Sequence, residues 1–114
     1  MNDRPILVTG ATGYIGGRLV PKLLQEGYRV RAMGRSLAKL SCRPWSRHEH
    51  IELVEGDVLD ADAIEQAADG CRAAFYLVHS MIAAKEKFAA ADRTGARNMV
   101  RSGTQGGLSQ IIYL

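Results

Sequence analysis

Short apolar runs alternate with stretches of helical spacing along this chain of 114 residues. The runs are mostly β-branched or aromatic, and the stretches between them repeat apolar residues every three to four positions or contain polar turn residues. This alternation is typical of a parallel sheet whose strands are joined by helices. We therefore expect a three-layer α/β fold, with helices on both faces of a parallel sheet of about five strands. The expected strands are 5–9, 28–33, 51–55, 73–78 and one that starts at 111, and the expected helices are 14–26, 37–40, 61–68 and 82–101.

A few local signals set the expected ends of the helices. Gly27 and Gly70 are expected to end the first and third helices, and Asp60 or Asp62 to cap the third. Pro21 falls inside the first helix, where a proline removes one hydrogen bond and clashes with the carbonyl four residues earlier. We expect a kink or a local loss of helical regularity there, and a loop at 41–50.

The composition limits the size and surroundings of this fold. With 46% hydrophobic residues the chain is too apolar to be disordered, and it can form one core without metal or disulfide bonds. We expect residues 1–114 to form a single domain, the N-terminal part of a longer protein, because the sequence stops inside a strand-like run. The apolar runs are far shorter than the ~20 residues that a membrane span needs. No apolar leader occurs and only Cys42 and Cys71 are present, so we expect a cytoplasmic protein with no membrane partner.

Three glycines mark the turn between the first strand and the first helix. Gly10, Gly13 and Gly16 stand at three-residue intervals, where an apolar strand gives way to an amphipathic helix. Without side chains there, backbone amides and the positive end of the helix can approach a phosphate group. The glycine-rich turn, residues 10–16, is therefore predicted to bind phosphate. The alternative is a turn whose glycines only allow the helix to pack close to the strand.

Together with three other segments, this turn resembles the short-chain dehydrogenase/reductase superfamily, in particular its extended and atypical epimerase/dehydratase and NmrA-like members. The other segments are 28–36, 56–60 and 76–81, so the resemblance covers essentially the whole chain. It implies a Rossmann-type NAD(P)-binding domain with the strand order 3-2-1-4-5. The cofactor site that it implies consists of Gly10, Thr12, Gly13, Tyr14, Ile15, Gly16, Arg35, Asp57, Val58, Val78 and His79.

The residues after the second strand indicate which nicotinamide cofactor binds. NAD sites place a carboxylate there, about twenty residues after the glycines, to bond the ribose 2′-hydroxyl. This chain has Gly34 instead, followed by Arg35. A guanidinium can pair with the 2′-phosphate of NADP, with Arg31 or Lys39 nearby, and the missing acid removes a repulsion. We therefore expect NADP rather than NAD; the alternative is that Arg35 is a solvated surface charge.

By the same resemblance, two further turns contribute to the site. Asp57 would accept a hydrogen bond from the adenine amino group, with the backbone of Val58 beside it; the alternative is that Asp57 only caps a helix-entry turn. His79 and Ser80 follow the fourth strand at the edge where open α/β sheets bind ligands. Many relatives carry an Asn-Ala-Gly or Ala-type turn there, so a structural or capping role for these two residues stays open.

The sequence assigns no catalytic residue. Family members that transfer hydride use a tyrosine with a lysine four residues later, usually on the helix after the fifth strand. Three tyrosines here are followed at that distance by other residue types: Tyr14 by Arg18, Tyr28 by Ala32 and Tyr76 by Ser80. Two functions stay open. One is the cofactor-binding part of an oxidoreductase or nucleotide-sugar epimerase/dehydratase with a small-molecule substrate, and the other is an NAD(P)-sensing regulator or scaffold that does not turn the cofactor over.

Other kinds of partner have weaker support. Residues 29–50 carry six basic side chains against one acid, but Trp45 is the one aromatic residue and no nucleic-acid-binding motif occurs, so we expect no nucleic-acid partner. His48, His50 and Cys42 lack the spacing of a metal site, and no metal is expected. A fifth strand at the edge of the sheet would favour a homodimer.

Overall fold

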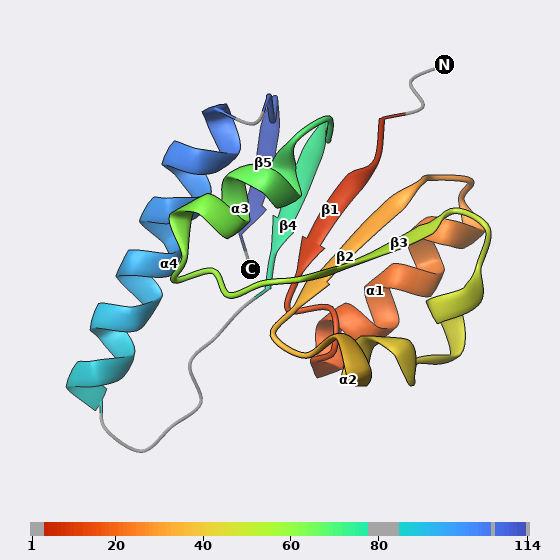
Figure 1. The fold of residues 1–114 in the computed structure, drawn as a ribbon, viewed down its shortest axis with the longest axis horizontal. Coiled ribbons are helices and arrows are strands. Elements are labelled where there is room, and N and C mark those ends of the chain that lie inside the picture. Colours follow the sequence, from red (N-terminus) through yellow and green to blue (C-terminus); the bar gives the residue numbers. More distant parts are fainter. Residues whose placement is uncertain (1–3, 78–84, 106, 114) are drawn as a thin grey trace.

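The computed structural model describes residues 4–77, 85–105 and 107–113. Its strands form one sheet in the order β3-β2-β1-β4-β5, and every neighbouring pair is parallel. The arrowheads therefore point to the same edge of the sheet (Figure 1). The expected fold class and strand order are confirmed. The strands are β1 (Ile6–Thr9), β2 (Val30–Gly34), β3 (Ile51–Glu55), β4 (Ala73–Tyr76) and β5 (Gln110–Tyr113).

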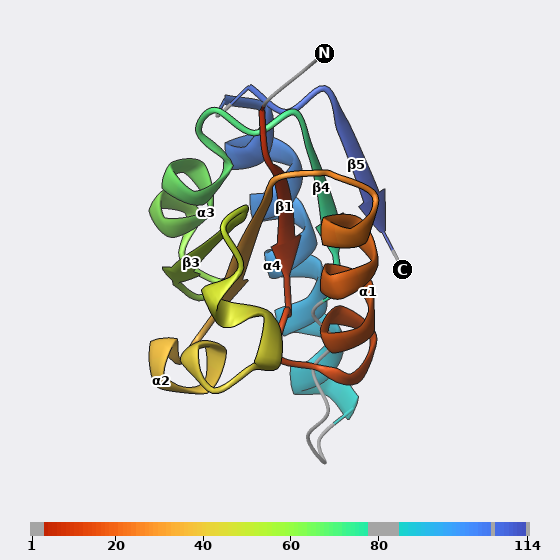
Figure 2. The same cartoon turned by 90° about the vertical axis from the view of Figure 1, so that its right-hand side faces the viewer.

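Helices cover both faces of the sheet (Figure 2). The first face carries α1 (Tyr14–Gln25), α2 (Leu37–Ser41) and a short 3-10 helix, η1 (Pro44–Arg47). The second face carries α3 (Ala61–Ala68) and α4 (Lys85–Gln105). Within the described ranges, no helix is both long and apolar enough to cross a membrane.

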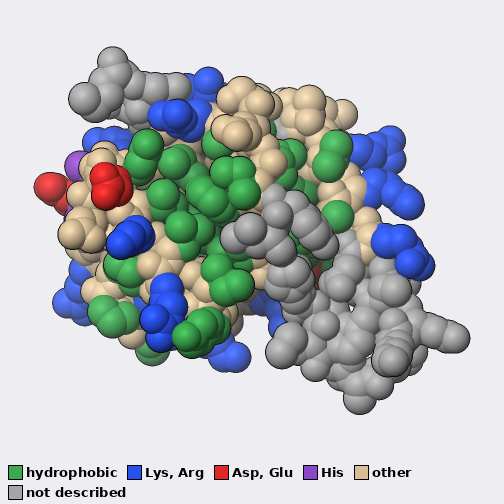
Figure 3. Space-filling view, turned by 180° about the vertical axis from the view of Figure 1, so that it is seen from behind, with side chains coloured by type: hydrophobic (Ala, Val, Ile, Leu, Met, Phe, Trp, Pro, Cys, Tyr) green, Lys and Arg blue, Asp and Glu red, His purple; other side chains and the backbone are tan. Residues whose placement is uncertain are grey.

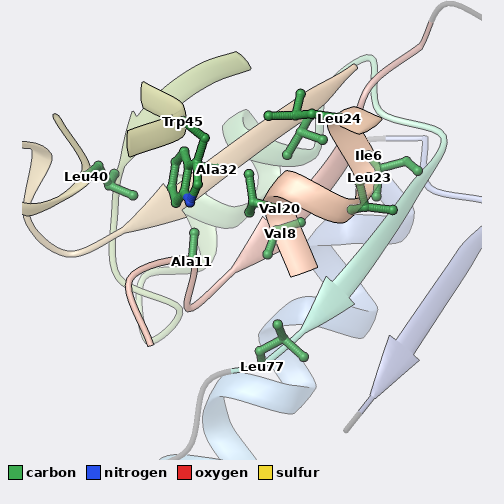
Figure 4. Packing of buried hydrophobic residues seen from close by; sticks show 11 residues of the cluster. Ile6, Val8, Ala11, Val20, Leu23, Leu24, Ala32, Leu40, Trp45 and Leu77 are labelled. Carbon is green, nitrogen blue, oxygen red and sulfur yellow. The ribbon is translucent and has the colours of Figure 1, made fainter. Parts of the chain in front are cut away.

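The central strand β1 supplies side chains to two separate cores. Its residues are all buried, as expected for a parallel strand covered on both faces. Successive side chains of a strand point to opposite faces, so Ile6 and Val8 pack with α1 whereas Leu7 packs with α3 and α4. Figure 4 shows the first core, in which Val20 and Leu23 of α1 lie against β1.

Pro21 does not interrupt α1, so the expected loss of helical regularity is wrong. The helix continues from Tyr14 to Gln25 with Pro21 inside it. Pro21 is exposed, so the carbonyl of Gly17 that loses its hydrogen bond faces the solvent side of the helix. The opposite, buried face holds the helix on the sheet, because packing outweighs local propensity. That face consists of Gly16, Val20, Leu23 and Leu24.

Two other boundaries differ from expectation by more than two residues. The segment 41–50 is not only a loop, because Pro44, with its fixed φ, begins η1. The last helix continues to Gln105 instead of 101, and the chain leaves it at Gly107, whose φ is +100°. Residues 82–84 of that expected helix lie outside the described residues, as does Val78 of the fourth expected strand.

Asp60, not Asp62, caps α3, since its Oδ1 accepts the N–H groups of Asp62 and Ala63.

Hydrophobic side chains gather on the face of the molecule that carries α1 (Figure 3). Phe75 of β4 and Ile112 of β5 are opposite each other in the register and are half-buried. β5 is the last described strand on this side of the sheet.

Candidate functional site

A cavity of about 240 Å³ opens at the carboxyl edge of the sheet, where β1, β2, β3 and β4 end. Ligands of open α/β sheets bind at this edge. Six of the predicted site residues line the cavity: Gly10, Thr12, Gly13, Arg35, Asp57 and Val58. The other lining residues are Thr9, Met33, Gly34, Gly56 and Leu77.

The glycine-rich turn is folded tightly against the end of β1. Gly10 has a φ of +70°, which residues with a side chain rarely adopt, and the N–H of Gly13 donates to the Gly10 carbonyl at 3.0 Å. A Cβ on Gly16 would collide with that carbonyl and would lie 2.8 Å from the Cα of Ala11. Gly16 therefore allows the close packing of helix and strand, while Gly10 and Gly13 leave backbone exposed to the cavity. Gly16 thus fits the packing interpretation, and Gly10 and Gly13 fit the phosphate-binding interpretation.

The N-terminus of α1 is open to an anion. Gly13 precedes the helix without a side-chain cap, and the first turn contains no acidic residue. In contrast, Ser36 caps α2 and Asp60 caps α3. The first N–H groups of a helix have no intrahelical acceptor, and the helix dipole favours negative charge beside them. The side chains of Tyr14 and Ile15 are exposed and do not line the cavity, so the backbone of these residues is the part that can serve a ligand.

Arg35 lies on a short loop whose following residues are fixed by two hydrogen bonds. Ser36 Oγ accepts the N–H of Lys39, and Glu55 Oε1 accepts the N–H of Leu37 at 3.0 Å. The Arg35 side chain is exposed and lines the cavity. Among the residues that the structure describes, no carboxylate forms an ion pair with its guanidinium. Its positive charge is therefore available to an anionic group in the cavity.

Arg31 does not assist Arg35, and the expectation that it lies nearby for that purpose is wrong. Its Nη1 donates to the carbonyls of Ala67 and Asp69, each at 2.6 Å, and its Nε pairs with Glu52 at 3.0 Å. The alternation of side chains along β2 directs Arg31 to the face that carries α3. It holds the end of that helix and does not line the cavity.

The turn between β3 and α3 presents Asp57 and Val58 to the cavity. Asp57 Oδ1 accepts the N–H of Leu59 at 2.9 Å, which closes the turn, although the cap of α3 is Asp60. Val58 is buried, and its carbonyl accepts a hydrogen bond from Asn98 Nδ2 of α4 at 2.9 Å. The turn is thus held by one hydrogen bond within it and by one from α4.

The lining residues that the sequence interpretation missed lie at strand ends. Thr9 is fully buried, and its hydroxyl donates to the Phe75 carbonyl at 3.3 Å and accepts the N–H of Leu77 at 3.4 Å. The N–H of Gly56, just after β3, donates to the carbonyl of Gly34, the last residue of β2, at 2.8 Å. Because the carboxyl ends of parallel strands meet at one edge, the ends of the expected strands contain the signal for these residues.

Some predicted residues are not described. Val78 and His79 lie outside the described residues, and so does Ser80. Of the histidines considered for a metal, His48 accepts the N–H of His50 through Nδ1 at 3.0 Å. No group of three metal-ligating side chains occurs in the part of the chain that the structure describes.

Comparison with known proteins agrees with the fold. A family model described as NAD(P)H-binding matches residues 10–114. The 3 beta-hydroxysteroid dehydrogenase/Delta 5-->4-isomerase of Mycobacterium tuberculosis is 29% identical over 117 residues, which cover 95% of this chain and 30% of that protein.

Two solved structures are similar to this one. Pen from Bacillus thuringiensis has a TM-score of 0.86 at 19% identity, covering 98% of this chain and 37% of its own. A short-chain dehydrogenase/reductase superfamily protein from Agrobacterium tumefaciens, solved with bound NAD, has a TM-score of 0.74 at 26% identity and is covered to 31%, against 95% of this chain. The chain thus spans about a third of the length of the proteins that it matches.

Proposed function

We infer that this chain, which belongs to the NAD(P)H-binding family of the short-chain dehydrogenase/reductase superfamily, binds NADP in preference to NAD. The family supports a nicotinamide dinucleotide as the ligand, and the preference rests on Arg35. The observation that carries the proposal is one cavity lined by both the glycine-rich turn and Arg35, beside a helix N-terminus without a side-chain cap.

The glycine-rich turn fits the pyrophosphate. Backbone at Gly10, Thr12 and Gly13 faces the cavity, and the N–H groups of Tyr14 and Ile15 begin α1. The N–H groups of Tyr14 and Ile15 can donate to phosphate oxygens, since Gly10 and Gly13 place no Cβ in the way, and the helix dipole adds to the attraction. Gly16 contributes from beneath the turn by allowing the helix to approach the strand.

The adenosine half of the cofactor would lie against the lining residues that follow β2 and β3. Arg35 would pair with the 2′-phosphate through its guanidinium, since no acid at the end of β2 repels it. Asp57 has one oxygen in the turn and would accept the adenine amino group, with the Val58 backbone beside the base. Val78 and His79, assigned by resemblance, stay predictions.

The bound nicotinamide would supply a hydride donor or acceptor to the complete protein. We propose that the complete protein is an oxidoreductase or a nucleotide-sugar epimerase/dehydratase with a small-molecule substrate. The dehydrogenase activity in the name of the mycobacterial relative supports the first of these. The residues of this chain would hold and orient the cofactor, and no catalytic residue is assigned among them. An NAD(P)-sensing regulator would use the same binding site and differ in leaving the cofactor unreacted.

Two further proposals concern the surroundings of the protein. Phe75 of β4 and Ile112 of β5, the last described strand on that side, are half-buried and favour a homodimer, because exposed apolar strands recruit other chains. A cytoplasmic location stays a prediction from the sequence.

Calorimetric titration with NADPH and NADH tests the cofactor proposal. We expect NADPH to bind at least about tenfold more tightly than NADH, and Arg35→Ala to remove that advantage, because a hydrogen bond to a charged group contributes about 1.5–3 kcal/mol. Arg29→Ala is the matched control, since Arg29 is an exposed cation just before β2, at the opposite end of that strand. Equal binding of the two cofactors, or an equal effect of Arg29→Ala and Arg35→Ala, would contradict the proposal.

A further inference from the structure

The segment that connects α2 to β3 lies against the glycine-rich turn, although about thirty residues separate them in the sequence. Trp45 of η1 is buried in the same hydrophobic cluster as Ala11 of the turn and Ala32 of β2. Figure 4 shows these three residues close together at one end of the cluster. The Trp45 contact therefore brings η1, and Arg43 just before it, to the glycine-rich turn.

Arg43 makes a polar contact with this turn. Its Nη2 donates a hydrogen bond to the carbonyl oxygen of Thr12. The bond is partly buried and charge-assisted, a type about twice as strong as a neutral hydrogen bond. Unlike Arg35, Arg43 does not line the cavity.

The contact fixes one peptide group of the glycine-rich turn. The Thr12 carbonyl and the Gly13 N–H belong to the same planar peptide unit. The carbonyl accepts from Arg43, and the N–H donates to the Gly10 carbonyl at 3.0 Å. Both polar groups of this peptide are therefore used within the protein, and its orientation is set before a ligand arrives.

The neighbouring peptide groups determine what this orientation means for a ligand. The N–H of Ala11 donates to the Met33 carbonyl at 3.3 Å, so the turn is also fixed on its β1 side. With the peptide between Thr12 and Gly13 fixed as well, the N–H groups at the start of α1 keep one direction relative to the cavity. Arg43 also holds the electronegative Thr12 oxygen, which would repel a phosphate if the peptide turned over.

We propose that Arg43 is a positioning residue, which orients the glycine-rich turn for the pyrophosphate of the dinucleotide by holding the Thr12 carbonyl. This inference rests on the proposed function, because it assumes that a dinucleotide binds at the turn. The pyrophosphate is common to NADP and NAD, so Arg43 contributes equally to the binding of both. Arg35, in contrast, contributes to NADP alone.

Calorimetric titration of NADPH and NADH into variants of the chain tests this role. Arg43→Met keeps the aliphatic stem and removes the donors, and we expect it to weaken both cofactors by the same factor of about ten. Arg43→Lys, which keeps a charged donor, is expected to restore most of that affinity. Arg47→Ala is the matched control, an exposed cation at the end of η1, and is expected to change binding less than about twofold. Circular dichroism selects a temperature at which every variant is folded.

Three results would overturn the positioning role. Unchanged binding in Arg43→Met would show that the turn does not need the contact. A loss confined to NADPH would make Arg43 a direct ligand of the 2′-phosphate instead. A loss in Arg43→Lys as large as in Arg43→Met would mean that the donor itself is not the determinant. If Arg43→Met does not fold, Arg43→Gln, which keeps a neutral donor, takes its place, with a partial loss expected for both cofactors. A wild-type chain that binds neither cofactor would instead contradict the proposed function.

Discussion

The fold changes the pKa of the Cys71 thiol. Its side chain is fully buried, and burial raises the pKa of the thiol to about 11, from an ordinary value of 9.0. The positive charges of Arg31 and Arg4 lower the pKa but do not offset the burial. The thiol therefore stays protonated and unreactive at neutral pH. Cys42, in contrast, is exposed.

The stability of the fold should consequently depend on Cys71 at alkaline pH. Since the folded pKa lies above the unfolded one, the contribution of the thiol is complete below pH 9 and is lost as the pH rises through 11. We predict that wild type loses roughly 2 kcal/mol more of its free energy of unfolding than Cys71→Ala does between about pH 8 and 11. Urea denaturation of both chains across this range measures the difference. Cys42→Ala should follow wild type, and parallel curves for wild type and Cys71→Ala would disprove the effect.

The contact between α4 and the sheet depends on the absence of a side chain at one helix position. Gly95 is buried, and a Cβ there would collide with the hydroxyl of Tyr76 and lie 3.1 Å from Val58 Cγ2. Tyr76 itself is only 1% exposed and has little room to move. Gly17 of α1 is the opposite case, because a Cβ there would have no neighbour within 4 Å.

Alanine at these two helix positions should therefore have opposite effects. Overpacking costs typically 1–3 kcal/mol, and the helix propensity of alanine returns up to about 1 kcal/mol, so we expect Gly95→Ala to lower the free energy of unfolding by roughly 1–2 kcal/mol. Gly17→Ala, with the same change of propensity and no clash, should raise it by about 0.5–1 kcal/mol. Chemical denaturation provides both values. A Gly95→Ala chain as stable as Gly17→Ala would show that α4 can move away from Tyr76 at no cost.

Sequence patterns predicted the regular elements because these depend on local periodicity. The apolar residues of β1 and the glycine-rich turn were recognised in this way. Patterns predicted a helix through Pro21 but also a kink or a local loss of regularity there, and the helix stays regular because its opposite face packs on the sheet. They did not predict that η1 packs on the turn, which depends on the burial of Trp45. The contact of Arg43 with Thr12 joins residues 31 positions apart in the sequence, so no local pattern predicts it.

The candidate site forms only when the chain folds, because the ends of four strands contribute to it. The sequence predicted six of the lining residues, those in recognisable turns such as Gly10, Arg35 and Asp57. Thr9 and Leu77 were not predicted, because they join the site through the pairing of β1 with β4. Arg31 was expected near Arg35, and the alternation along β2 places it on the other face of the sheet. Composition and spacing thus give the residue types, and the topology decides which of them meet.

A two-dimensional ¹H–¹⁵N NMR titration of the 114-residue chain with NADPH shows directly whether the dinucleotide binds at the glycine-rich turn. Binding at the proposed site predicts that the amide signals of 10–16, 34–37 and 56–59 shift most, since these segments surround the cavity. Shifts concentrated instead near Asp62, Glu65 and Asp69, which line a second cavity on α3, would place the ligand elsewhere. The absence of shifts at millimolar NADPH would contradict the claim that the glycine-rich turn of this chain binds the dinucleotide.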